Sequence, residues 1–410
     1  MGSFDAFRYR DYRLLWIGAV LSNTGTWMQT IALGWYVFQL THSAFWVSFI
    51  TFINFIPIVL SPLGGVYTDR LDRKKILLGT QVIMMLDATV LAILAWTGHA
   101  NLAAVMILTF GQGLMIAFNG PTWMAFITSL VPPRGMVNAI ALNSAQFNLA
   151  RVIGPAIAGV IIGLSSRGPA IVFTFNAASF VAVLIALALI RSHPRPQKEA
   201  RGLWELLVGG LSYTWRHERI RVMIASGGAM SFFAAPAAAL LPVFAADVFH
   251  RGAGSYGSLA AAAGLGSVAG ALVLGRLGNR ISPVVVAEAL VGVGLCLILF
   301  GAIPVYPAGL LLIFLYGVVF LLFVSGNNSD VQLQVEEPMR GRVLSIWMLA
   351  VGVSLPVGSL LAGVAAEAWG APATTIAGGI GCALWGLAML RRFRGPATQT
   401  RFQPSAEPLT

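Results

Sequence analysis

The sequence predicts an all-α membrane protein in which twelve transmembrane helices form two six-helix bundles related as parallel repeats. Composition is the first indication: 57% of the 410 residues are hydrophobic and only 10% are charged, whereas soluble domains carry about 25% charged residues. The second is a series of twelve apolar runs, each long enough for the roughly 20 residues of helix that cross a bilayer. The third is an internal repeat.

The apolar runs follow one another through almost the whole chain, with short polar loops between them. Arg8, Arg10 and Arg13 precede the first run. That run is too long for the core of a signal peptide and lacks a small-residue cleavage pattern, so we expect it to remain as a helix. The runs cover residues 14–38, 43–66, 76–97, 101–128, 137–164, 168–190, 220–248, 255–278, 283–303, 307–330, 343–369 and 371–390.

Basic residues are distributed unevenly over the loops. Nearly all of the 26 Lys and Arg lie in the N-terminal segment, in the loops after even-numbered runs and in the C-terminal tail, whereas the opposite loops hold only Arg167 and Arg251. Cytoplasmic loops carry an excess of Lys and Arg. We therefore expect a multi-pass protein with both termini in the cytoplasm, whose net charge of +11 faces the anionic inner leaflet.

The chain divides into two halves at a polar segment. Residues 191–201 are basic and contain proline, which is typical of a linker. Apolar residues then recur at helical spacing from Trp204 to Trp215, which predicts a helix lying on the inner membrane surface. The predicted units are an N-terminal bundle at 1–190, a linker with this helix at 191–219, a C-terminal bundle at 220–390 and a cytoplasmic tail at 391–410.

The second half of the chain repeats features of the first. The fifth and eleventh runs align without a gap, which places Gly154 on Gly358 and Gly159 on Gly363. Two six-helix halves related as parallel repeats are one architecture of secondary transporters. The loops after runs two and eight also align, pairing Gly65 with Gly275, Asp69 with Asn279 and Arg70 with Arg280.

The loop between the second and third runs carries the most specific motif. It reads Gly-x-x-x-Asp-Arg-x-x-Arg-Lys-Lys from Gly65 onward, with Asp69, Arg70 and Arg73 as its central charges. This pattern resembles the signature loop between helices 2 and 3 of the major facilitator superfamily, which has Gly where this chain has Asp72. The resemblance implies a twelve-helix secondary transporter that works by alternating access.

In the superfamily this loop meets the cytoplasmic start of the eleventh helix when the transporter is closed to the cytoplasm. A carboxylate at a helix N-terminus stabilises the contact by about 0.3–1 kcal/mol, and by up to about 2 kcal/mol when partly buried. We therefore expect Asp69→Asn to favour the inward-facing state and nearly abolish transport, and Asn279→Asp to be tolerated. The predicted gating residues are Gly65, Asp69, Arg70, Arg73, Asn279 and Arg280.

The fifth run holds a second motif, in which Arg151 is followed by Gly154, Pro155 and Gly159. Pro155 cannot donate to the carbonyl of Arg151, and the glycines allow close helix approach. The segment resembles the antiporter motif of superfamily exporters. With the opening residues 7–16 it looks most like bacterial macrolide-efflux and enterobactin exporters, which implies proton-driven export of amphiphilic small molecules, drugs or siderophore-like compounds, across a bacterial cytoplasmic membrane.

Three acidic residues are candidates for proton coupling. Asp87 lies about 18 Å of helical rise beyond Lys75, close to the bilayer centre, where a carboxylate is a functional candidate by default. A structural, hydrogen-bonded Asp is the alternative. Glu288 and Asp330 lie nearer the cytoplasmic side, where Glu288 can extend to the interface. Arg151, at a depth similar to that of Asp87, either bonds carbonyls freed at the proline kink or pairs with Asp87.

Polar and aromatic residues in runs one, four, seven and ten predict a substrate cavity between the bundles. Polar groups at this depth normally face protein or a water-filled space, and helix packing is the alternative reading. Because fixed charge is scarce in this set, we expect neutral or amphiphilic substrates rather than dications. The set comprises Asn23, Trp27, Gln112, Asn119, Phe232, Phe320 and Asn327.

The sequence does not support an enzyme or an ATP-driven pump. The five His lie in or near loops, and no His-x-x-x-His pattern, nucleophile elbow or phosphate loop occurs. The two cysteines suggest neither a disulfide framework nor a metal site. We expect no cofactor, no metal and no nucleic-acid partner, and a monomer whose partners are a small-molecule substrate, protons and membrane lipid.

Two other functions stay open, because a fold alone does not determine function. One is a solute importer or facilitator, which in the case of sugars should line its cavity with more charged and hydroxyl groups. The other is a scaffold or lipid-handling protein that transports nothing and should show no solute-dependent proton flux.

Overall fold

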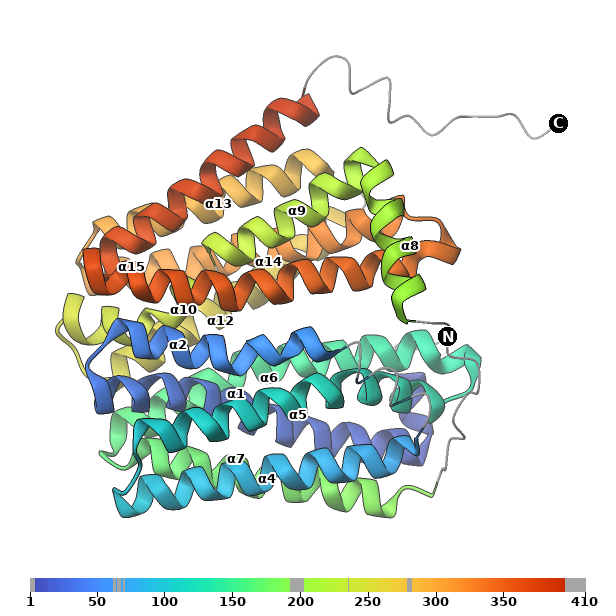
Figure 1. The fold of residues 1–410 in the computed structure, drawn as a ribbon, viewed down its shortest axis with the longest axis horizontal. Helices are drawn as coiled ribbons and strands as arrows, with labels where there is room; N and C mark the ends of the chain where they lie inside the picture. The colour runs from blue at the N-terminus through green and yellow to red at the C-terminus, as the bar shows by residue number, and fades with distance from the viewer. Residues whose placement is uncertain are drawn as a thin grey trace.

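The computed structural model describes residues 4–61, 64, 68, 71–191, 203–234, 236–278 and 282–394. Within these residues every regular element is a helix. Figure 1 shows two bundles lying side by side, one built from the first half of the chain and the other from the second. This is the all-α membrane architecture that the sequence predicts.

The N-terminal bundle contains the first six spans. Asp72 begins the third span, because its carboxylate accepts a hydrogen bond from the backbone N–H of Lys74 at 2.9 Å. Asn101 begins the fourth by accepting from Ala104 at 2.8 Å; both caps satisfy donors that a helix start leaves free. Pro57 converts the second span to 3₁₀ geometry, since proline removes a helical hydrogen bond. The elements are η1 (Asp5–Arg8), α1 (Arg10–Thr41), α2 (Ala44–Phe55), η2 (Ile56–Leu60), α4 (Arg73–Thr97), α5 (Leu102–Ser129), η3 (Pro133–Gly135), α6 (Met136–Leu164) and α7 (Gly168–Leu189).

The C-terminal bundle contains the other six spans, and helix α8 (Leu203–Arg216) lies across one end of the molecule (Figure 1). The seventh span consists of α9 followed by three short helical pieces, of which the last is π-helical. Gly370, with φ of 82°, separates the two arms of α15, because glycine adopts positive φ without strain. The elements are α9 (Glu218–Phe233), α10 (Pro236–Ala239), α11 (Leu241–Val243), η4 (Phe244–Val248), α12 (Ala253–Leu277), α13 (Pro283–Ala302), α14 (Tyr306–Gln334) and α15 (Glu337–Arg394).

The observed helices match the twelve predicted runs within a few residues. Nine helical segments of the described chain are long and apolar enough to cross a membrane, and one of them, Met339–Arg394, holds two predicted runs. The first two runs correspond to α1 and to the shorter Ala44–Leu60. Helix α15 continues to Arg394, four residues past the end of the last predicted run. Ion pairs of Arg392 and Arg394 with Glu218 and Glu288 hold this last turn.

The internal repeat is visible in the packing. A Cβ added at Gly154 would lie 2.7 Å from the Trp27 Cβ of α1, and one at Gly358 would lie 2.8 Å from the Phe232 Cα of α9. The equivalent glycines of α6 and α15 therefore allow the first helix of their own bundle to pack closely against them. Their partners one turn and a half later face the other bundle: Gly159 meets α12, and Gly363 meets α2.

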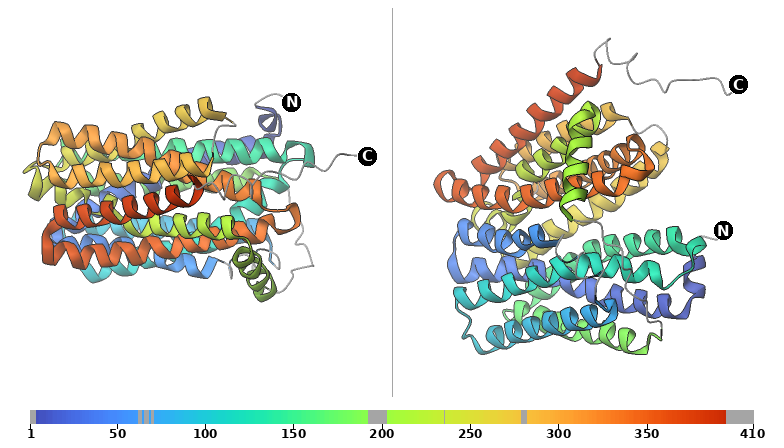
Figure 2. Two further views of the ribbon diagram at one scale, coloured as in Figure 1. Left: turned by 90° about the horizontal axis from the view of Figure 1, so that it is seen from above. Right: turned by 45° about the vertical axis from the view of Figure 1, so that its right-hand side comes forward.

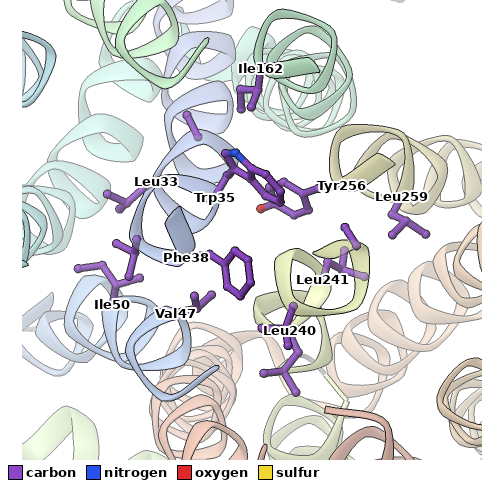
Figure 3. Close-up of a cluster of buried hydrophobic side chains, with 14 of the residues drawn as sticks. Leu33, Trp35, Phe38, Val47, Ile50, Ile162, Leu240, Leu241, Tyr256 and Leu259 are labelled. Carbon is purple, nitrogen blue, oxygen red and sulfur yellow. The ribbon is translucent and has the colours of Figure 1, made fainter. Parts of the chain in front are cut away.

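The bundles touch at the end opposite α8, which we call the far end. We call the end that carries α8 and η1 the α8 end (Figure 2). At the far end Trp35 of α1 stacks on Tyr256 of α12, with ring centroids 5.9 Å apart, and Figure 3 shows both rings within one apolar cluster. Glu367 of α15 also accepts hydrogen bonds there from the Ser43 hydroxyl at 3.1 Å and from the Phe45 N–H at 3.2 Å.

Candidate transport site

Arg151 lies near the middle of α6, between the two bundles. Its guanidinium carbon is 5.5 Å from the ring centroid of Trp27 on α1 and 5.5 Å from that of Phe320 on α14. The two rings belong to different halves of the chain, and yet the Arg151 side chain is exposed. Its exposed part therefore faces the space between the bundles.

Local sequence positions this side chain. Gly154 lets α1 approach α6 closely, which brings Trp27 to within reach of Arg151. Phe147, one turn before Arg151, packs edge-on against the same indole with centroids 5.8 Å apart. Pro155 leaves the carbonyl of Arg151 without its usual helical donor. The result is a cation on a helix interrupted by proline, with the rings of Trp27 and Phe147 beside it.

Neither predicted partner of Arg151 is found. Among the described residues Arg151 forms no hydrogen bond to a carbonyl and no ion pair with Asp87; the cation–π contacts with Trp27 and Phe320 take their place. A guanidinium stays protonated in proteins. One positive charge therefore lies between the bundles at mid-helix.

A network of amide side chains lies next to this site in the N-terminal bundle. Asn23 donates to the Oε1 of Gln146 at 3.1 Å. Gln29 donates to the Oε1 of Gln112 at 2.8 Å, and its own Oε1 accepts from Asn176 at 2.7 Å. Gln29, Gln146 and Asn176 were not among the predicted residues, although an amide within an apolar run was a signal that could have found them.

One cavity lies beside these amides and another at the far end. The first, of about 50 Å³, is lined by Gln29, Gln112, Asn54, two threonines and neighbouring apolar residues. A larger one of about 300 Å³ lies at the far end and is lined by Trp35, Gln39 and the last turn of α6. The second cavity lies at the junction of the bundles, because Ala253 of α12 also lines it.

Asp87 lies within α4 and points at α5. A Cβ added at Gly111 would lie 3.2 Å from its Oδ2 atom, so the missing side chain of Gly111 makes room for the carboxylate. This Oδ2 atom is buried and has no hydrogen-bond partner among the described residues. An ionised carboxylate is costly to bury without a partner, so this position suits a group that takes up a proton.

The other two acids are paired. Asp330 of α14 is buried and forms an ion pair with Arg219 of α9, whose Nε atom lies 3.1 Å from Oδ2. Glu288 of α13 is about half exposed and forms an ion pair with Arg394. Both pairs tie helices of the C-terminal bundle to one another, so they differ from the unpaired carboxyl group of Asp87.

The remaining cavity candidates differ in their surroundings. Asn327 is fully buried, donates to the Met223 carbonyl at 2.9 Å and accepts from the Trp347 indole at 2.7 Å, so it lies inside the C-terminal bundle. Phe232 lies where α9 packs on α15. Asn119 is half buried, and its Oδ1 atom has no partner among the described residues.

Most of the predicted gating residues, Gly65, Asp69, Arg70, Asn279 and Arg280, lie outside the described residues. Arg73 is described: its Nη1 atom donates to the Ala125 carbonyl at 3.2 Å, which ties the start of α4 to the end of α5. Nearby, the hydroxyl groups of Thr68 and Thr122 are 2.6 Å apart. The loop is therefore anchored to α5 on both sides of its charged centre.

Comparison with known proteins agrees with this architecture. A family model described as transmembrane secretion effector matches residues 1–409. The chain belongs to the major facilitator superfamily. It is thus a multi-pass membrane transporter, and the fold and the family that the signature loop implied are both confirmed.

Curated relatives cover nearly the whole transporter. The staphyloferrin A transporter of Staphylococcus aureus is 27% identical over 84% of this chain and 87% of its own length. The enterobactin exporter of Citrobacter koseri is 26% identical over 94% of both chains. Macrolide efflux protein A of Streptococcus pyogenes is 23% identical over 88% of this chain and 91% of its own length.

Solved structures share the fold at low sequence identity. A bacterial homologue of the human lysosomal transporter Spinster, in an inward-facing and unoccupied conformation, superposes with a TM-score of 0.78 at 14% identity, covering 97% of this chain and 99% of the other. The nucleoside transporter NupG gives a TM-score of 0.71 at 14% identity, covering 94% of this chain and 100% of the other. These likenesses concern the fold.

Proposed function

We propose that this transporter exports amphiphilic small molecules, driven by proton entry, through alternating access of its two bundles. The observation that carries the proposal is Arg151, a charged group held at mid-helix between rings from both bundles. A ligand bound there contacts both halves at once, as alternating access requires. Two of the relatives are named as an exporter and an efflux protein, and the third as a siderophore transporter. These names support outward transport and this kind of substrate.

The proposed membrane is the bacterial cytoplasmic membrane, with both termini inside and the protein acting as a monomer. Support comes from the excess of Lys and Arg in alternate loops, which favours a cytoplasmic α8 end. The far end, where Trp35 stacks on Tyr256, then faces outward. Contact between the bundles at that end corresponds to an inward-facing transporter.

Asp87 is the proposed proton carrier. Its buried Oδ2 atom lacks a partner among the described residues, whereas Asp330 and Glu288 are occupied by arginines. A carboxyl group without an ion-pair partner can exchange a proton without breaking a contact between helices. The signature loop around Asp69 would set the balance between the inward-facing and outward-facing states.

The test is transport by inside-out membrane vesicles from a strain that expresses the protein, with a panel of siderophores, macrolides and other drugs. Accumulation of one compound class in energised vesicles, abolished by a protonophore, is the expected result. Loss of preloaded compound from the vesicles would indicate an importer. No movement of any compound, with the protein present and folded, would indicate a scaffold and would contradict the proposal.

A further inference from the structure

We propose that Arg151, Trp27 and Phe320 form a binding site for an amphiphilic organic anion. The acid group would bind the guanidinium, and an aromatic or apolar body would lie against the rings. The inference rests on the proposed function, because it names the class of substrate that the transporter would export. It narrows the sequence-based expectation of neutral or amphiphilic substrates to amphiphilic anions.

Among the described residues, no neighbouring carboxylate balances the charge of Arg151. Arg151 forms no ion pair with any acidic side chain of the described residues, and its contacts are two ring faces. Such contacts stabilise a cation without neutralising its charge, and ionisable groups at membrane depth are normally paired. The pairing partner is missing from the described part of the protein. An anionic ligand supplies it.

The geometry of the guanidinium suits an acid group. A guanidinium offers five N–H donors in a fixed planar fork, which matches the two oxygens of a carboxylate. Contact with the faces of Trp27 and Phe320 positions Arg151 without using a hydrogen-bond acceptor, so its donors stay available for a ligand. The exposure of the Arg151 side chain gives a ligand access.

An apolar wall lies beside the cation. Trp27 and Phe147 pack edge-on, and Phe147 is 44% exposed, so an aromatic surface remains open one turn from Arg151. On the other bundle, the ring of Tyr316 lies 5.5 Å from that of Phe320. Such surroundings favour a ligand with a flat apolar body. The Arg151 charge would repel dications.

The experiment uses full-length protein in nanodiscs of phosphatidylcholine and three probes of one shape: 2-naphthoate, the neutral 2-naphthamide and the cationic 2-naphthylmethylammonium. Calorimetric titration should show naphthoate binding about 10-fold more tightly than naphthamide, as one charge-assisted interaction of about 1.4 kcal/mol provides, with the cation weakest. Arg151→Gln should weaken the affinity for naphthoate about 10-fold and change the affinity for naphthamide by no more than about 2-fold. The preference for the anion would then be lost. Arg151→Lys should retain part of the preference.

Arg251→Gln is the matched control, because Arg251 also stacks on an aromatic ring, that of Tyr306 at 4.4 Å, but at the far end. It should leave all three affinities unchanged. Equal binding of the three probes to the unmodified protein would overturn the proposal, and so would an equal loss for all probes in Arg151→Gln. The comparison on unmodified protein decides the question even where a variant does not fold.

Two further outcomes distinguish a substrate site at Arg151 from a lipid site, and this proposal from the proposed export. If phosphatidylglycerol in the nanodiscs displaces naphthoate, the site binds lipid headgroups and the substrate assignment fails. Anion binding through Arg151 without export of any compound from vesicles would leave the site standing and contradict the export function. Export of neutral compounds, with no preference for anions in binding, would support the export function and contradict the anion site.

Discussion

At the residue scale, the described membrane core contains two charged side chains without a protein counter-ion, and both lie in the N-terminal bundle. Arg151 is stabilised by aromatic rings, and Asp87 has a carboxyl oxygen without a partner. Among the other buried polar side chains of the described chain, Gln29 and Asn327 form hydrogen bonds, whereas the Oε1 atom of Gln81 also lacks a partner. Our proposals of ligand binding at Arg151 and proton transfer at Asp87 rest on these two side chains.

Replacement of Asp87 by Asn should reduce substrate-driven proton movement by at least about 10-fold, because an amide cannot carry the proton. Substrate binding without a proton gradient should be unchanged, since Asp87 does not contact the Arg151 site. A pH-sensitive dye inside proteoliposomes measures the proton flux. Asp247→Asn, which neutralises an exposed acid of η4, is the control and should behave like the parent. Full coupling in Asp87→Asn would contradict the assignment.

Asp87 and Arg151 could be found from the sequence because a charge stands out in an apolar run. The contacts of Arg151 could not. Asp87 and Arg151 lie at similar depth along their helices, but α4 and α6 present them to different neighbours. The rings that approach Arg151 come from α1 and α14, which belong to different bundles. The sequence pattern of a single run does not predict how these helices pack.

At the element scale, helices α6 and α12 approach closely through glycines. The backbones of Gly159 and Gly257 are in contact, and Gly163 lies beside Gly254 one turn further on. Small residues allow such approach in membranes. The far end therefore closes by backbone contact, with the Trp35–Tyr256 stack beside it.

Replacement of Gly159 by Val should force the far end open, because the new side chain would overlap the Gly257 backbone. In a variant without the native cysteines, labelling of a cysteine introduced at Ala253 by a membrane-impermeant maleimide should rise several-fold. Gly79→Val is the control, since a Cβ added at Gly79 meets nothing within 4 Å. Equal labelling in Gly159→Val and the parent would show that this contact does not close the far end.

The buried ion pair of Arg219 and Asp330 joins α9 to α14. Asp330→Asn should lower the free energy of unfolding by about 3–5 kcal/mol, because it removes the buried carboxylate that pairs with the partly buried Arg219 guanidinium. Glu288→Gln removes the exposed pair with Arg394 and should cost less than about 1 kcal/mol. Denaturant unfolding in detergent followed by circular dichroism measures both. Similar small losses would mean that the buried pair does not stabilise the bundle.

Helix boundaries were predictable because apolar runs, caps such as Asp72 and prolines such as Pro57 act locally. The breaks within the seventh span were not predicted. Its run is continuously apolar, and only Pro236 and Pro242 indicated an interruption. The π-helical turn at Phe244–Val248 packs against α12 and α15 in the far-end cluster, so tertiary contacts determine it.

At the scale of the whole molecule, two bundles of related design meet at the far end, and a charged site lies between them. The repeat alignment predicted this symmetry, because Gly154 and Gly358 admit the equivalent helix in each bundle. The alternating-access account requires the bundles to move as units, so that one end opens as the other closes. A bound substrate shifts this equilibrium only by its difference in affinity for the two states.

The most direct test measures both ends of one helix pair in the same preparation. Spin labels at Leu164 and Gly252 report on the far ends of α6 and α12, and labels at Val137 and Leu272 report on their α8 ends; all four positions are exposed. Double electron–electron resonance in nanodiscs, with and without a compound that the vesicle assay identifies, gives the two distance distributions. We predict that the compound populates a state in which the far-end distance increases by several Å while the α8-end distance decreases. Distances that stay unchanged, or that change in the same direction at both ends, would contradict alternating access by these two bundles.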